Sequence, residues 1–124
     1  MLEEIVVGYD GSEAAKRALD RAAVLTGYGS RLTVVTVASK PGYSERSRRL
    51  LDEAADLLLA QRVFARPVER VGGNVAEELI AAARELGADL LVVGTRKTAL
   101  QRLALGSVSS AVVRRAPCDV LVTH

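Results

Sequence analysis

Residue types that support catalysis or cross-linking are scarce in this sequence. It has no tryptophan, one cysteine and one histidine, and aromatic residues make up only 3% of its 124 positions. The single cysteine, Cys118, excludes an intramolecular disulfide and a zinc site built from cysteines. The single histidine, His124, is the last residue of the sequence, which argues against a Ser-His-Asp triad. We therefore expect no catalytic residues and no metal site built by the chain itself.

Charge and hydropathy exclude further classes of protein. The 17 basic and 15 acidic residues give a net charge of +2. They are interspersed, so neither nucleic acid nor a membrane is expected as a partner. No apolar run approaches the roughly 18 residues that a membrane-spanning helix needs. The first ten residues, MLEEIVVGYD, lack the basic-then-apolar pattern of a secretion signal. The sequence predicts a soluble protein of the cytoplasm.

Segments typical of strands and helices alternate along the chain. Five short runs have the length and composition of strands; most are rich in valine and leucine, and the third is more polar. They are Glu4–Gly8, Arg31–Val37, Val63–Val71, Asp89–Gly94 and Asp119–Thr123. Four longer segments carry apolar residues at helical spacing, with Ser12 and Asn74 as N-caps and Gly87 as a C-terminal cap. They span residues 12–27, 44–62, 75–86 and 106–115. Pro67 indicates that the third strand lies at an edge of the sheet.

This alternation predicts an α/β fold with one domain over residues 1–124. Five parallel strands joined by helices form a doubly wound sheet, with the four helices covering both faces. In such a sheet, ligands bind beyond the carboxyl ends of the strands, where the strand order reverses. The candidate loops are therefore residues 8–12, 38–41, 72–74 and 95–105.

The loop after the fourth strand has the features of a phosphate pocket. Gly94 ends the strand and Gly106-Ser107 opens the last helix, so the backbone and the helix start can approach an anion. Arg96, Lys97 and Arg102 lie between them, and no acidic residue occurs from Thr95 to Ser107. The alternative interpretation is an ordinary N-cap followed by a solvated basic loop.

Asp10 is the candidate carboxylate of the loop after the first strand. At the tip of that strand it could accept hydrogen bonds from ribose hydroxyls or from an adenine amino group. The alternative is that Asp10-Gly11 makes a turn and caps the first helix. Spacing alone favours the turn. Enzymatic sites are not supported, because the Gly-Lys-Ser/Thr triplet of a P-loop is missing and no carboxylate pair falls on the candidate loops.

The whole chain resembles the universal stress protein family. The segment IVVGYDGSEAAKRALDRA is similar to the family's first strand, aspartate turn and alanine-rich helix. The segments AARELGADLLVVGTR and LGSVSSAVVRRAPCDVLVTH are similar to its fourth strand and to its last helix and fifth strand. The resemblance implies the strand order 3-2-1-4-5 and, in most members, a homodimer.

The resemblance also implies a nucleotide site. Members that bind ATP carry a motif of a glycine, two residues, a second glycine, nine residues and then Gly-Ser/Thr. In this sequence Gly94 matches the first glycine of the motif and Gly106-Ser107 matches its last pair. The middle glycine is missing and the loop is one residue short, because Lys97 follows Arg96 directly. By the same resemblance Asp10 contacts the adenosine part, Tyr9 belongs to the same turn and Val37 packs against adenine. The helix that meets the phosphates begins with Ser107, Val108 and Ser109.

These features predict a universal stress protein that binds an adenine nucleotide, ATP with Mg²⁺, and has a role in stress tolerance. The retained residues Asp10, Gly94 and Gly106-Ser107 favour binding without turnover. The missing glycine favours the alternative, a homodimeric stress or interaction protein whose pocket is vestigial.

The fifth strand is the expected dimer interface. Residues Cys118 to Thr123 are rich in valine and leucine, and they lack the lysine or internal proline that protects an exposed edge. Two such edges related by a two-fold axis can pair antiparallel and bury Val120 and Val122, or Leu121, against the partner. The alternative is that helices cover this edge and the protein is a monomer.

Overall fold

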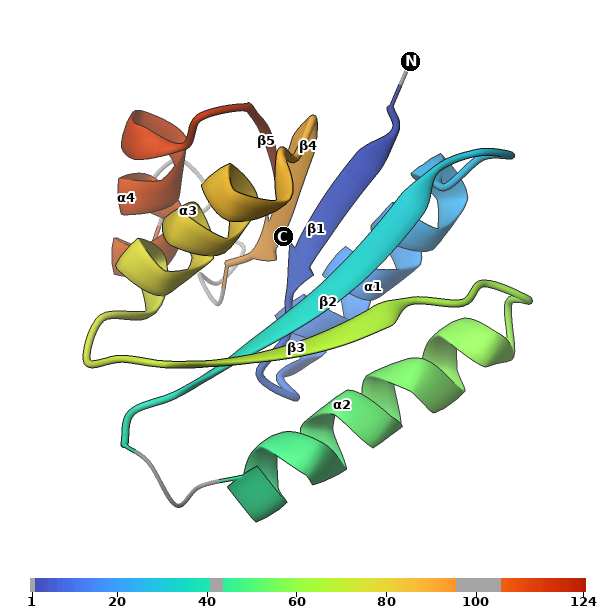
Figure 1. Ribbon diagram of the computed structural model, residues 1–124, viewed down its shortest axis with the longest axis horizontal. Coiled ribbons are helices and arrows are strands. Elements are labelled where there is room, and N and C mark those ends of the chain that lie inside the picture. Colours follow the sequence, from blue (N-terminus) through green and yellow to red (C-terminus); the bar gives the residue numbers. More distant parts are fainter. Residues whose placement is uncertain (1, 41–43, 96–105) are drawn as a thin grey trace.

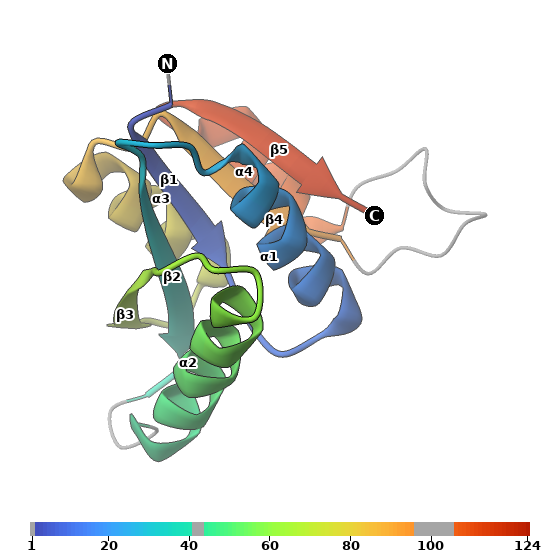
Figure 2. The same cartoon turned by 90° about the vertical axis from the view of Figure 1, so that its right-hand side faces the viewer.

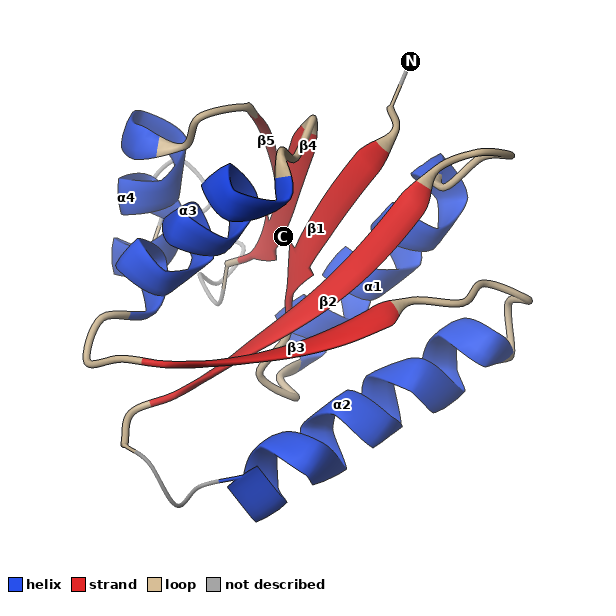
Figure 3. Ribbon diagram, viewed as in Figure 1, coloured by secondary structure: helices blue, strands red, loops and turns tan. Residues whose placement is uncertain are grey.

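The computed structural model describes residues 2–40, 44–95 and 106–124. Strands and helices alternate as predicted (Figures 1 and 3). The elements are β1 (Glu4–Gly8), α1 (Glu13–Leu25), β2 (Arg31–Ala38), α2 (Ser44–Leu59), β3 (Arg66–Val71), α3 (Val75–Leu86), β4 (Leu90–Gly94), α4 (Ser107–Arg115) and β5 (Asp119–Thr123).

The strands form one parallel sheet with the order β3-β2-β1-β4-β5. This order confirms the predicted α/β fold. Helices α1 and α2 pack on one face, whereas α3 and α4 pack together on the other (Figure 2). Alternate residues of the central strand face these two layers: Ile5 and Val7 lie on the side of α1 and α2, and Val6 faces α3. All three are fully buried, as expected for a parallel sheet that is covered on both faces.

The predicted helix caps are confirmed. The Ser12 hydroxyl accepts a hydrogen bond from the Ala15 N–H at the start of α1, and the Asn74 side chain accepts one from the Glu77 N–H at the start of α3. Gly87 ends α3 in the left-handed conformation, with φ of 63°. The first helix was expected to reach position 27, whereas α1 ends at Leu25 and its C-cap is Thr26.

The end of α2 and the start of β3 differ from the prediction. The helix ends at Leu59 rather than at position 62, and β3 begins at Arg66 rather than at position 63. The reason is a turn in which the Arg62 N–H donates to the Leu59 carbonyl and the Val63 N–H donates to the Leu58 carbonyl. Arg62 takes the left-handed conformation there, with φ of 61°. This is the hydrogen-bond pattern that usually has glycine at its turning residue.

Candidate functional site

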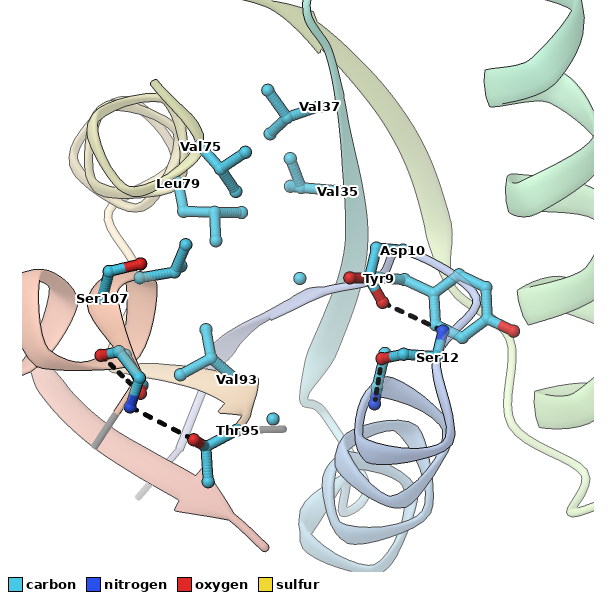
Figure 4. A pocket seen from close by; sticks show the side chains of 16 residues that line it. Tyr9, Asp10, Ser12, Val35, Val37, Val75, Leu79, Val93, Thr95 and Ser107 are labelled. Atoms are coloured by element: carbon cyan, nitrogen blue, oxygen red, sulfur yellow. Dashed lines mark hydrogen bonds between the residues drawn. The ribbon is translucent and has the colours of Figure 1, made fainter. Parts of the chain in front are cut away.

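A cavity of about 430 Å³ opens at the carboxyl ends of β1 and β4, where the strand order reverses (Figure 4). Its size is within the range of small-molecule sites. Eight residues predicted for the site line it: Tyr9, Asp10, Val37, Gly94, Gly106, Ser107, Val108 and Ser109. The other two predicted residues, Arg96 and Lys97, lie outside the described residues. The cavity therefore brings together the first and fourth loops that the sequence pointed to.

Eight further residues line the cavity that were not named individually as site residues: Gly8, Ser12, Ala15, Val35, Val75, Leu79, Val93 and Thr95. The strand and helix periods could have indicated several of them. Val35 lies two positions before Val37 on β2, and Val75 and Leu79 are one helical turn apart on α3. Gly8, Ser12 and Thr95 fall within the candidate loops 8–12 and 95–105, but no feature of the sequence singled them out as site residues.

One wall of the cavity is apolar. Valine and leucine side chains from β2, α3 and β4 form it, as Figure 4 shows for Val35, Val37, Val75, Leu79 and Val93. Gly8 at the end of β1 lets the Leu79 side chain pack directly against the β1 backbone, since a Cβ there would lie 3.1 Å from the Leu79 Cδ1. A flat, weakly polar group such as a heteroaromatic ring suits a surface of this kind.

Asp10 lies across the cavity from Ser107, in a tight turn (Figure 4). Its Oδ1 accepts a hydrogen bond from the Ser12 N–H at 3.0 Å, and Gly11 between them has φ of +82°. The turn interpretation of Asp10-Gly11 is therefore confirmed, although Ser12 rather than Asp10 caps α1. Asp10 is exposed and lines the cavity as well. Its role in the turn thus leaves it beside the space that a ligand would occupy.

Tyr9 lines the cavity with its main chain, while its ring points away toward α2 (Figure 4). The Tyr9 N–H donates to the Val35 carbonyl at 2.9 Å, which ties the end of β1 to β2. The ring is 3% exposed and its hydroxyl donates to the Glu53 carboxylate. Burial, followed by the hydrogen bond and the charge of Glu53, raises the pKa of the Tyr9 hydroxyl well above its ordinary value.

Gly94 is required by packing between β4 and α1. A Cβ at this position would lie 2.5 Å from the carbonyl carbon and the oxygen of Ala14, in the first turn of α1. No side chain can be accommodated so close to backbone atoms. The glycine therefore has a structural reason besides the approach of an anion that the sequence suggested.

Gly106 differs from Gly94 in this respect. A Cβ there would make ordinary contacts, 3.4 Å from the Thr95 Oγ1 and 3.7 Å from the Ser109 Oγ, and φ is −68°. The Gly106 N–H donates to the Thr95 hydroxyl at 3.3 Å, and the Ser109 hydroxyl donates to the Gly106 carbonyl. Thr95 also connects the ends of β4 and β5, because its N–H donates to the Thr123 carbonyl.

The start of α4 has the properties of an anion site. Gly106 occupies the N-cap position and has no side chain to accept a hydrogen bond from the first-turn N–H groups. No acidic residue occurs in that turn, and Ser107, Val108 and Ser109 line the cavity. First-turn N–H groups have no partner within a helix, and the helix dipole adds partial positive charge. The cavity therefore places hydrogen-bond donors opposite the Asp10 side and next to the apolar wall.

Two other features bear on alternative functions. Cys118 is partly buried just before β5, and burial raises the pKa of its thiol, which disfavours the reactive thiolate. Within residues 2–40, 44–95 and 106–124, no three His, Cys, Asp or Glu side chains are grouped so that they could hold a metal ion. Over the same ranges, no helix is both long and apolar enough to cross a membrane.

The fold defines a doubly wound α/β protein with a cavity at its topological switch point. A model of the universal stress protein family matches residues 1–124. A universal stress protein of Thermus aquaticus is 38% identical over 138 aligned residues that include the whole of both chains. A universal stress protein of Mycobacterium tuberculosis is 35% identical over 142 aligned residues, which cover 97% of this chain and 94% of that one.

Solved structures agree with these relatives. A universal stress protein crystallised in complex with cAMP has a TM-score of 0.82 and 35% identity, covering 99% of this chain and 97% of its own. A universal stress protein of Archaeoglobus fulgidus in complex with dAMP has a TM-score of 0.81 and covers all of both chains; at 23% identity it supports the fold alone. The chain belongs to the universal stress protein family.

Proposed function

We propose that this universal stress protein binds an adenine nucleotide in the cavity at the ends of β1 and β4, with ATP as the first candidate. The observation that carries the proposal is the arrangement around that cavity. An apolar wall, a carboxylate turn and an uncapped helix start surround one space of about 430 Å³. The related protein crystallised with cAMP, at 35% identity, supports a ligand of the same chemical class.

Each part of a nucleotide has a matching surface. The valines of β2 and β4, with Val75 and Leu79, would contact the adenine ring. Asp10 would accept hydrogen bonds from the ribose hydroxyls. The first-turn N–H groups of α4 from Ser107 to Ser109, with the backbone at Gly106, would bind phosphate oxygens.

Arg96 and Lys97 lie outside the described residues, so their role is proposed from the sequence. Arg96 and Lys97 add positive charge between Gly94 and Gly106 and would offset phosphate charge. Mg²⁺ would enter with ATP, since magnesium is commonly held by substrate phosphates with one or two carboxylates. The role is binding rather than turnover, in stress tolerance in the cytoplasm.

Isothermal titration with ATP, ADP and AMP, each with and without Mg²⁺, tests the proposal. We expect dissociation constants in the micromolar to millimolar range for the wild type. Gly106→Val should abolish binding by filling the space at the helix start, and Asp10→Ala should weaken it about tenfold by removing a charged acceptor. The matched controls are Gly73→Val, where a Cβ would meet nothing within 4 Å, and Asp52→Ala on the exposed surface of α2.

Absence of heat with all three nucleotides at millimolar concentration would overturn the proposal. That result would favour the vestigial pocket that the missing middle glycine suggested. If Gly106→Val and Asp10→Ala bind like the wild type while the wild type does bind, the nucleotide occupies another place.

We further propose that the chain forms a homodimer through β5. The strand pairs with β4 along one edge only, and Val120, Leu121 and Val122 are each partly exposed. Antiparallel pairing with a second copy would satisfy the backbone groups of the other edge and cover these side chains.

A further inference from the structure

Helix α2 supports the turn that carries Asp10. The helix lies outside the cavity, and none of its residues line it. Two of its residues, Glu53 and Leu50, nevertheless contact the residues on either side of Asp10. The Glu53 carboxylate accepts the hydrogen bond from the Tyr9 hydroxyl. Leu50, one helical turn earlier, lies so close to Gly11 that a Cβ there would be 2.9 Å from its Cδ2.

The Tyr9 side chain is a rigid connection between α2 and the turn. Its ring is 3% exposed and packed in the core cluster that contains Ala54 and Leu58 of α2. Its main chain continues directly into Asp10. Because the ring has only two rotatable side-chain bonds, fixing the hydroxyl at one end restricts the backbone at the other. The raised pKa keeps the hydroxyl protonated, so it remains a donor to Glu53 across the neutral range.

We propose that Glu53, acting through Tyr9, is a positioning residue that holds Asp10 at the rim of the cavity in the orientation that a ribose needs. This inference rests on the proposed function. Neither Glu53 nor the Tyr9 hydroxyl contacts the ligand. Their contribution is preorganisation: the carboxylate of Asp10 is in place before the nucleotide arrives, and less freedom is lost on binding.

Nucleotide titrations of single variants form the first test. Tyr9→Phe and Glu53→Ala should each lower the affinity for ATP about fivefold, because each removes the same hydrogen bond. Glu53→Gln keeps an acceptor oxygen and should restore affinity to within about twofold of the wild type. Tyr28→Phe removes a hydroxyl from a fully exposed ring and serves as the control for Tyr9→Phe. Asp52→Ala is the control for Glu53→Ala.

A double-mutant cycle separates positioning from general loss of stability. In an Asp10→Ala background, Tyr9→Phe should change affinity by less than about twofold, because the group that it positions is gone. Equal losses in both backgrounds would overturn the inference, as would wild-type affinity in Tyr9→Phe or in Glu53→Ala.

A measurement without ligand keeps the inference testable even if no nucleotide binds. The Ser12 N–H is bonded to Asp10 Oδ1 and reports how well the turn is held. Its hydrogen exchange, followed by NMR, should be about fivefold faster in Tyr9→Phe and in Glu53→Ala than in the wild type and Glu53→Gln. Unchanged exchange in those two variants would refute the positioning role. Faster exchange together with no nucleotide binding would refute the proposed function alone.

Discussion

Replacing Gly94 by alanine tests whether this glycine is required by packing. The added Cβ would lie 2.5 Å from the carbonyl carbon and the oxygen of Ala14, and 2.9 Å from its Cβ. The first two are backbone atoms of α1, so no rotamer change relieves the contact. Either α1 moves away from the sheet or β4 shifts in its register with β1 and β5.

The expected cost follows from two opposing effects. Replacing glycine by alanine within a strand ordinarily stabilises a protein by roughly 0.5–1 kcal/mol, because the unfolded chain loses freedom. Overpacking a buried site costs about 1–3 kcal/mol, and more where backbone must move. Because backbone atoms must move, the cost should lie near the upper end of that range, and the clash should lower the free energy of unfolding by a net of about 2 kcal/mol. For a domain of this size the melting temperature should fall by about 4 °C per kcal/mol, or about 8 °C in all.

Thermal and urea unfolding followed by circular dichroism measure this effect. Gly73→Ala is the matched control, since a Cβ there would meet nothing within 4 Å and its φ is not positive. It should unfold within about 0.5 kcal/mol of the wild type. A Gly94→Ala variant as stable as the wild type, or more stable, would show that α1 and β4 are not packed as described.

Two further predictions concern assembly and alkaline pH. Light scattering at micromolar concentration should give twice the 13.2 kDa chain mass for the wild type. Leu121→Pro removes a backbone donor from β5 and should shift the protein toward monomer. A wild-type mass of one chain that does not change with concentration would contradict pairing through β5. The raised pKa of Tyr9 means that the unfolded chain loses this proton first, near pH 10, while the folded chain keeps it. The stability that Tyr9 adds relative to Tyr9→Phe should therefore be constant below pH 10 and decline above it, by at most about 1.4 kcal/mol per pH unit. Urea unfolding of the wild type and of Tyr9→Phe up to about pH 11 measures this difference in the free energy of unfolding. If the difference between the two proteins stays constant above pH 10, the predicted pH dependence is wrong.

Most of the fold could be predicted because local patterns and tertiary packing agree. Strands β1, β2, β4 and β5 are short runs rich in valine, leucine or isoleucine, and Ser12, Asn74 and Gly87 mark helix ends with the expected hydrogen bonds. The end of α2 could not be predicted, because Arg62 takes the left-handed conformation without being glycine. Residues other than glycine rarely adopt a positive φ, so nothing in the sequence indicated that the helix would end there.

The candidate site was less predictable than the fold, since its side chains belong to elements far apart in the sequence. Strand ends indicated Asp10 and Gly94, but no pattern indicated that Thr95 would accept a hydrogen bond from the Gly106 N–H. Likewise the sequence placed Tyr9 at the site without giving the direction of its ring. That direction depends on α2, which begins 35 residues after Tyr9 in the sequence.

The two glycines at the ends of the fourth loop illustrate why a motif needs its structural context. Gly94 is explained by its neighbours, because Ala14 leaves no room for a side chain. Gly106 is explained neither by its backbone, with φ of −68°, nor by its neighbours, which would tolerate a Cβ. As an N-cap it is also weaker than serine, aspartate or asparagine would be, since it offers no side-chain acceptor. A glycine that its neighbours do not require, at a helix start that lines a cavity, is what the proposed approach of a phosphate to the backbone would need. Gly106 therefore supports the proposed phosphate contact more directly than Gly94 does, although the sequence motif gives the two glycines equal weight.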